Sequence, residues 1–219
     1  MFSAASLTEL LFPTRCLGCR NLGIRICSQC RSLWNPHIYR SSITFAGKSL
    51  PVYSSVIYSS VAQKVLLGAK ESALTDADQL MSLALSHALT YFNGEIGMAD
   101  LIPVPSRKSA TRKRGRDFLL TQTEIVADAS NVRVRPILSH RRKVADQTRL
   151  TVIEREENLN GAFICANRSQ LGNIPVIIID DLMTSGATLR EAARALGDAG
   201  FRPLGAVTAC VAQPLRYTQ

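Results

Sequence analysis

Apolar runs alternate with helical patterns along most of the chain. The clearest run, 176–179, holds four consecutive apolar residues between Pro175 and two acids. Such unbroken runs are typical of strands buried on both faces in parallel sheets. Strands are predicted at 52–58, 99–104, 132–138, 162–165, 176–181 and 205–212, and helices at 61–69, 76–92, 118–129 and 190–200. Strands that alternate with helices predict an α/β fold, a mainly parallel sheet flanked by helices.

Three segments interrupt this alternation. Residues 5–12 carry leucines at helical spacing before Pro13, which predicts a short amphipathic helix. Residues 32–50 show no clear period and are predicted to be a connector. The polar segment 139–159 is long for a loop inside a compact domain, so we expect either disorder or a mobile cover over an active site.

Composition narrows the class of protein. The 219 residues are 46% hydrophobic and 20% charged, which fits a globular chain with one main domain and a small appendage. No apolar run approaches the roughly 18 residues that cross a bilayer, so no membrane partner is expected. The first residues lack a basic region and a cleavage motif, so we expect no signal peptide and a cytoplasmic location. The net charge of +9 indicates a nucleic-acid partner or a cavity for a polyphosphate.

Four cysteines lie close to the N-terminus in two C-x-x-C pairs, Cys16 with Cys19 and Cys27 with Cys30. This spacing predicts a structural zinc ribbon in a module of residues 1–35, followed by a main domain at 50–219. Disulfides and an iron–sulfur cluster are the alternatives, less favoured by the absence of a secretory signal and by the paired spacing. Cys165 and Cys210 are predicted to be core residues, and His37 a surface residue rather than a further ligand.

The strand at 176–181 ends in the candidate functional site. Ligands of parallel sheets bind beyond the carboxyl ends of the strands, where Asp180 and Asp181 would emerge. Two neighbouring acids can accept hydrogen bonds from the hydroxyls of a ribose. The turn that follows offers hydroxyls, backbone N–H groups and a helix start, which suit a phosphate; its residues are Thr184, Ser185, Gly186, Ala187 and Thr188. The alternative is a solvated acidic turn without a ligand.

Basic residues gather after another predicted strand. Six lie between Arg107 and Arg116 with no acid among them, and Arg141 and Arg142 open the long polar segment. A charge run is usually a solvated helix start or loop. This one follows a strand end, which favours an anion-binding role.

The segment VIIIDDLMTSGATL resembles the phosphoribosyl-diphosphate (PRPP) motif of the type I phosphoribosyltransferases. Within them, the chain is most similar to the ComF family, also described as GntX-like. The likeness covers the four-cysteine ribbon, IPVPSRK…KRGRDF, QTRL…REENLNGAF and the PRPP motif, in that order. Many relatives have R-G-F-N-Q where this chain has Arg114-Gly115-Arg116-Asp117-Phe118.

The resemblance implies a role for each matching residue. Asp180 and Asp181 would bind the ribose hydroxyls, and 184–188 the 5′-phosphate. Ser106 and Arg107 would lie in the diphosphate loop, and the segment with Arg141 and Arg142 would close over PRPP. Donors of this kind stabilise charge that builds on a leaving group, so these three arginines are the predicted catalytic residues.

The implied reaction is displacement of diphosphate from C1 of PRPP by a nitrogenous acceptor. Mg²⁺ is expected to bridge PRPP oxygens. Purine-salvage members place an acidic general base where this chain has Thr184, so the motif supplies no base. The alternative function is a non-catalytic PRPP sensor, or a protein associated with single-stranded DNA during DNA uptake. A homo-oligomer is a further possibility that the sequence does not decide.

Overall fold

The computed structural model describes residues 13–142, 159–166 and 172–212, and its α/β class confirms the prediction. Five strands form the main sheet in the order β1-β2-β7-β6-β3, in which only β1 is antiparallel to its neighbour. Their bounds are β1 (Tyr39–Phe45), β2 (Lys48–Ile57), β3 (Asp100–Pro103), β6 (Ile174–Met183) and β7 (Phe201–Val211).

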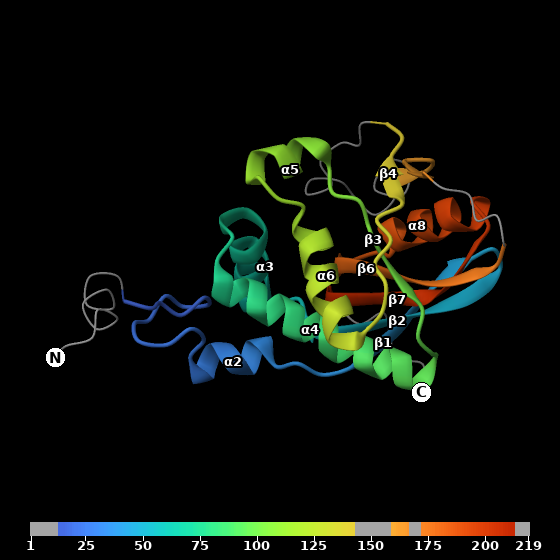
Figure 1. Ribbon diagram of the computed structural model, residues 1–219. Helices are drawn as coiled ribbons and strands as arrows, with labels where there is room; N and C mark the ends of the chain where they lie inside the picture. The colour runs from blue at the N-terminus through green and yellow to red at the C-terminus, as the bar shows by residue number, and fades with distance from the viewer. Residues whose placement is uncertain (1–12, 143–158, 167–171, 213–219) are drawn as a thin grey trace.

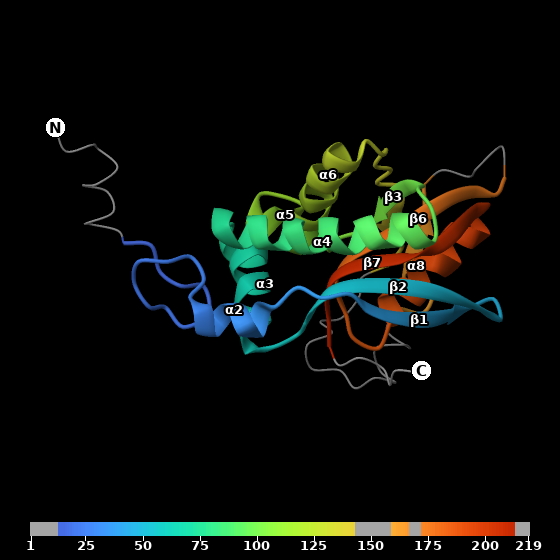
Figure 2. The same ribbon diagram turned by 90° about the horizontal axis from the view of Figure 1, so that it is seen from below.

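Helices cover both faces of this sheet (Figures 1 and 2). The helices of the described residues are α2 (Ser28–Trp34), α3 (Ser60–Ser72), α4 (Thr75–Glu95), α5 (Lys108–Arg114), α6 (Phe118–Ser130) and α8 (Ala187–Asp198). The step from β2 to β3 runs one way across the sheet, and the step from β6 to β7 runs the other way. Because parallel crossovers are right-handed, α4 lies on one face and α8 on the opposite face. α6 packs beside α4.

This topology locates the crevice of the sheet. β6 and β3 are neighbours, yet the chain leaves β6 toward α8 on one face and leaves β3 toward α5 and α6 on the other. Neighbouring strands whose connections part in this way form a switch point, and ligands of open α/β sheets bind there. The predicted acids and the predicted diphosphate loop therefore both follow the two strands of this switch point.

The core is built around β6 and α4. Val176 to Ile179 are at most 2% exposed because β6 has a strand on each side and helices on both faces. α4 turns Met81, Leu85 and Leu89 to the sheet at intervals of four residues, each at most 1% exposed. Burial of each such side chain stabilises the fold by about 1.5–3 kcal/mol. No helix in the described residues is long and apolar enough to cross a membrane.

A second, two-stranded sheet pairs β4 (Leu138–His140) with β5 (Phe163–Cys165). It is attached to α8 through two side chains of that helix. Glu191 accepts a hydrogen bond from the Phe163 backbone N–H (2.8 Å), and Arg194 donates one to the Phe163 carbonyl (3.0 Å). The β4–β5 hairpin therefore packs against α8, the helix that follows the turn of the candidate site.

The connector predicted at 32–50 is wrong: this segment holds the end of α2, all of β1 and the start of β2. β1 is an edge strand in which only Ile43 is buried, so its hydrophobic alternation is weak. The strand predicted at 132–138 is also wrong as a full strand. Val134 forms a single bridge beside Leu101 of β3, and the chain then leaves for β4. The helix predicted at 5–12 and most of the segment 139–159 lie outside the described residues.

Candidate functional site

Asp180 and Asp181 lie near the carboxyl end of β6, and both are 8% exposed. Successive residues of a strand point to opposite faces, so the two carboxyl groups flank the strand end. Asp181 forms an ion pair with Lys70, near the end of α3. Asp180 stands in register with Thr208 of β7 and accepts a hydrogen bond from the Asp181 backbone N–H (2.8 Å). Both acids are thus held in place before any ligand arrives.

The three charges act on one another. Burial, with the neighbouring Asp181 carboxylate, raises the pKa of Asp180 to about 8, although Lys70 acts in the opposite direction. Burial alone lowers the pKa of Lys70, but the Asp181 and Asp180 carboxylates outweigh it, so its pKa is raised. At neutral pH one acid can therefore donate a proton in a hydrogen bond while its neighbour accepts.

The turn after β6 leads directly into α8. Gly186 is the N-cap residue with a φ of 77°, a conformation that favours glycine. A Cβ added there would lie 2.7 Å from Ile43 Cγ2, so the position also lacks room. The Ser185 hydroxyl oxygen accepts a hydrogen bond from the Ala187 N–H (3.4 Å), and the N-cap residue, a glycine, has no side chain to cap the helix. Thr184 and Thr188 are half-buried on either side of it. A helix start with a glycine N-cap and adjacent hydroxyls suits an anion.

The loop after β3 begins beside the acids. The Val104 N–H at the start of this loop donates to the carbonyl of Ile179 (2.9 Å), the residue directly before Asp180. Ser106 donates from its hydroxyl to Asp117 (2.8 Å), and Asp117 caps α6 through the Leu120 N–H. Arg107 is exposed and is the N-cap residue of α5. Ser106 therefore supports the loop, and Arg107 is its accessible cation.

The β4–β5 hairpin reaches this loop. His140, the last residue of β4, is hydrogen-bonded through Nε2 to the Pro105 carbonyl (3.0 Å). Arg141 and Arg142 follow it and are exposed, and Arg142 donates to the Asn160 carbonyl (3.0 Å). The predicted arginines of the hairpin and the predicted diphosphate loop are thus joined through one histidine.

Two interactions at the site were not predicted from the sequence. Lys70 neutralises Asp181 across 111 residues of sequence, and nothing in the helical pattern of α3 distinguishes this lysine from others. Arg116 pairs with both carboxylate oxygens of Asp78 on α4 (2.8 and 2.9 Å). One indication of this contact was present in the sequence, the departure from R-G-F-N-Q at Arg116 and Asp117. Arg116 binds Asp78 of α4, and Asp117 caps α6.

The four cysteines predicted as metal ligands, Cys16, Cys19, Cys27 and Cys30, converge, with their Sγ atoms all within 4.8 Å of one another. Burial alone raises the pKa of Cys16, but N–H groups of Cys19, Cys27 and Gly18 bring it down to about 6. A Cβ on Gly18 would collide with Cys30 Sγ, and the Gly18 carbonyl accepts from Lys64 of α3 (2.6 Å). The knuckle is therefore shaped around the cluster and anchored to the main body.

This donor set fits a tetrahedral ion. Zinc with four thiolates at about 2.3 Å would place the sulfur atoms about 3.8 Å apart, and Cys19 and Cys27 already lie at 3.6 Å. Backbone N–H groups that point at the sulfurs, as from Cys27 to Cys16 (3.4 Å), are common around bound metals. His37 is exposed, contacts Tyr39, and is not part of the cluster. Cys210 is a fully buried core residue, and Cys165 is partly buried.

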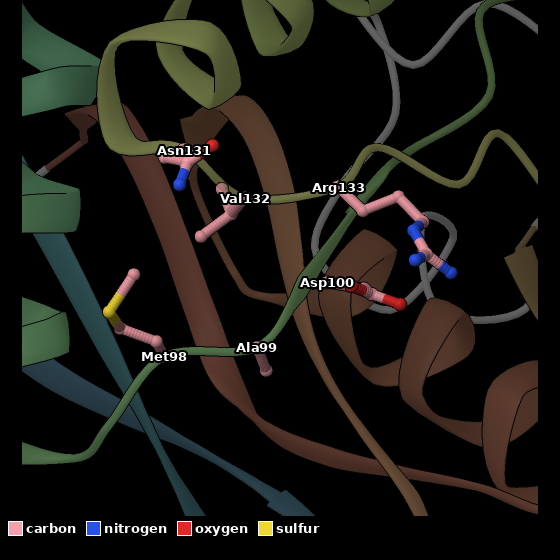
Figure 3. A pocket seen from close by; sticks show the side chains of 6 residues that line it. All are labelled: Met98, Ala99, Asp100, Asn131, Val132 and Arg133. Carbon is pink, nitrogen blue, oxygen red and sulfur yellow. The ribbon is translucent and has the colours of Figure 1, made fainter.

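An open hollow of about 480 Å³ lies at the amino end of β3. Figure 3 shows Asp100 and Arg133 turned the same way, with Met98 on the other side. Asp100 is already paired with Arg135. No predicted site residue lines this hollow, and it lies at the strand ends opposite to the crevice.

No family model and no curated protein matches the chain. Among solved structures it is similar to an adenine phosphoribosyltransferase, with 12% identity, coverage of 84% of this chain and 89% of that one, and a TM-score of 0.46. It is also similar to the adenine phosphoribosyltransferase of Saccharomyces cerevisiae complexed with an imino-altritol bisphosphate and adenine (13%, 85% and 89%, 0.45). A third is the UMP synthase of Leishmania donovani (17%, 83% and 30%, 0.40).

Proposed function

We propose that this chain binds PRPP at the carboxyl end of β6 and transfers its phosphoribosyl group to a nitrogenous acceptor. The observation that carries the proposal is the direct passage from two buried acids, through a glycine turn, into the start of α8, whose N-cap residue is Gly186. This arrangement stands at the switch point of the sheet. In this proposal the ribose lies beside the two acids, and the 5′-phosphate lies at the start of α8.

The electrostatics of the acids suit a vicinal diol. Because burial and the Asp181 carboxylate raise its pKa, Asp180 can hold a proton and donate it in a hydrogen bond to one ribose hydroxyl. Asp181 accepts from a hydroxyl while Lys70 compensates its charge. The 5′-phosphate takes the N–H groups and hydroxyls of 184–188, where the helix dipole favours an anion.

The leaving diphosphate takes the cations on the other side of the crevice. Arg107 on the loop after β3, and Arg141 and Arg142 on the hairpin, neutralise charge as the bond to C1 breaks. Mg²⁺ would arrive with the substrate and would supply further positive charge to the leaving diphosphate. Positioning and exclusion of water supply the rest of the catalysis.

We assign the four-cysteine cluster to zinc with a structural role, since four thiolates leave no open position for chemistry. With the order of its motifs, this module is the reason for proposing the ComF family in particular. Residues 1–35 and 50–219 remain the proposed division of the chain.

Single-stranded DNA binding and self-association stay predictions. The run from Arg107 to Arg116 offers less positive surface than its sequence suggests. The Arg114 side chain is only 7% exposed, and Arg116 is paired with Asp78. A DNA partner would therefore meet fewer free cations on this face than six.

A diphosphate-release screen tests the function. The protein is incubated with PRPP, Mg²⁺ and a panel of nitrogenous bases, and diphosphate is measured. We expect one class of base to stimulate release in the wild type, Asp181→Asn to abolish it, and Asp128→Asn, on the exposed face of α6, to leave it unchanged. Release that persists in Asp181→Asn would contradict the assigned ribose site, and no release with any base would leave a PRPP sensor as the better description.

A further inference from the structure

His140 links two segments that the fold brings together from far apart in the sequence. It ends β4 on the hairpin, and Pro105 lies in the loop after β3. A carbonyl oxygen only accepts hydrogen bonds, so the imidazole Nε2 must carry the proton in the contact with Pro105 (3.0 Å). The contact therefore fixes the ring orientation and its tautomer.

The other ring nitrogen, Nδ1, lacks a hydrogen-bond partner among the described residues. Nδ1 of His140 is fully buried, and within the described ranges no group donates to it or accepts from it. The ring packs edge-to-face on Phe163 of β5 at 5.1 Å between centroids. A buried polar atom without a hydrogen bond costs about 1–3 kcal/mol, so such atoms often mark the place of a ligand or a bound water.

The imidazole is held neutral in the free protein. Burial has the largest effect and lowers its pKa; the hydrogen bond to the Pro105 carbonyl raises the pKa by less, and the positive charge of Arg107 lowers it by a smaller amount still. With Nε2 protonated, Nδ1 then carries a lone pair. It cannot donate to an anion until it takes up a proton.

The charged groups of the packed elements leave no acid for an imidazolium. On the loop side these are Arg107 and Asp117, and Asp117 already accepts from Ser106. After β4 the chain continues with Arg141 and Arg142. On α8, Glu191 is bonded to Arg194 and to the Phe163 N–H. Of these charged groups, Arg107 acts on the pKa of His140, and both acids already have other partners.

We propose that His140 is a proton-linked ligand of the diphosphate group that binds at the Pro105–Arg107 loop. The anion offsets Arg107, Nδ1 takes a proton from solvent, and the new N–H donates to a diphosphate oxygen. When diphosphate leaves, the proton returns to solvent and the ring is neutral again. The inference rests on the proposed function only for placing diphosphate at this loop.

Titration calorimetry with Mg²⁺ and free diphosphate, at pH 8 and pH 6, tests the linkage. His140→Gln is the critical variant, because a glutamine amide can still donate to Pro105 but does not titrate. His87→Gln is the matched control, since His87 is bonded to Ser55 of β2 away from the loop. The ligand's own titration is common to all three proteins and cancels in their ratios.

We expect the wild type to bind more tightly than His140→Gln at pH 6 and the advantage to shrink by about tenfold at pH 8. His87→Gln should follow the wild type. In addition, diphosphate should raise the pKa of His140 in a proton NMR titration, which is tractable because the chain has three histidines. A constant ratio, or a His140 pKa unchanged by diphosphate, would overturn the proposal.

Two further ligands separate this inference from the proposed function. Ribose 5-phosphate lacks the diphosphate, so its binding should show no dependence on His140, and an equal dependence would overturn the assignment. PRPP should show the same linkage as diphosphate. If PRPP binds without it, the inference fails and the proposed function stands. If diphosphate shows it while PRPP does not bind, His140 keeps its role and the proposed function fails.

Discussion

The four-cysteine cluster and the acids of β6 are both built from residues close together in the sequence. The residues that complete the two sites differ in how far away in the sequence they lie. All four sulfurs of the cluster come from one stretch of fifteen residues, 16–30, and they satisfy one another's geometry. The acids depend on Lys70 of α3, on Thr208 of β7 and on a loop after β3. The first site is closed by its own ligands, whereas the second is assembled by the whole sheet.

This difference predicts how each region fails. Loss of one sulfur should remove the ion and unfold a local module, because no other donor of the described residues is within reach. Loss of one charge at the carboxyl end of β6 should leave the fold intact and change the energy of the charged groups that remain. The predictions below separate these two behaviours.

The largest effect is expected for Cys16→Ser. Cys16 is 1% exposed and its sulfur is central to the cluster, so we expect loss of about one bound zinc per chain and of metal-derived stability on the order of 10 kcal/mol for the module. Metal analysis and limited proteolysis between α2 and β1 measure both. Cys165→Ser, outside the cluster, should retain the ion. A metal-free wild type that resists proteolysis equally well would refute the zinc assignment.

Lys70→Met is expected to lower the free energy of unfolding by about 2 kcal/mol, because Asp181 is left buried without a countercharge. This value lies between those of surface and fully buried pairs, as Lys70 is about one-third exposed. Urea unfolding measures it. The double variant with Asp181→Asn should lose less than the sum of the two single changes. Strict additivity would mean that the pair contributes nothing to stability.

The pH dependence of stability should report on Asp180. Its pKa is raised in the folded protein from 3.8 to about 8, so the folded state binds more protons than the unfolded state between these values. The contribution of Asp180 to the free energy of unfolding is therefore complete below about pH 4. It falls as the pH rises toward 8, by up to about 1.4 kcal/mol per pH unit. Asp180→Asn mimics the protonated acid and should flatten this slope in urea unfolding from pH 5 to pH 8. An unchanged slope would assign it to other groups.

The smallest effect separates strain from crowding in the turn. Gly186 and Gly115 both have positive φ values, 77° and 72°, but only Gly186 has a neighbour in the way of a Cβ. Alanine at Gly115 should cost about 1 kcal/mol through φ alone, and alanine at Gly186 about 1 kcal/mol more. Thermal unfolding compares them. Equal losses would mean that Ile43 yields to the added methyl group.

Local patterns predicted the parts of this molecule that are themselves local. The C-x-x-C spacing predicted the cluster, and the apolar run before Asp180 predicted β6, because neighbours in sequence determine both. β1 was missed because an edge strand with one buried residue has little hydrophobic period. Residues 132–138 were misjudged because Val134 only touches the edge of β3 before the chain turns away.

The partners of the site were beyond sequence reasoning for the same reason. Lys70 and His140 act through contacts across 111 and 35 residues, and neither belongs to a recognisable motif. The arginines after Pro105 were assigned as a group, but the fold divides them. Arg107 stays accessible, whereas Arg116 is bound to Asp78 and supports α4.

Titration of the wild-type protein with PRPP and Mg²⁺ tests the ribose–phosphate site most directly. We expect one PRPP per chain, and no measurable binding by the double variant Asp180→Asn, Asp181→Asn. Urea unfolding of the double variant is the control that it is folded. Failure of the wild type to bind, or equal binding by the folded double variant, would contradict the site at the end of β6.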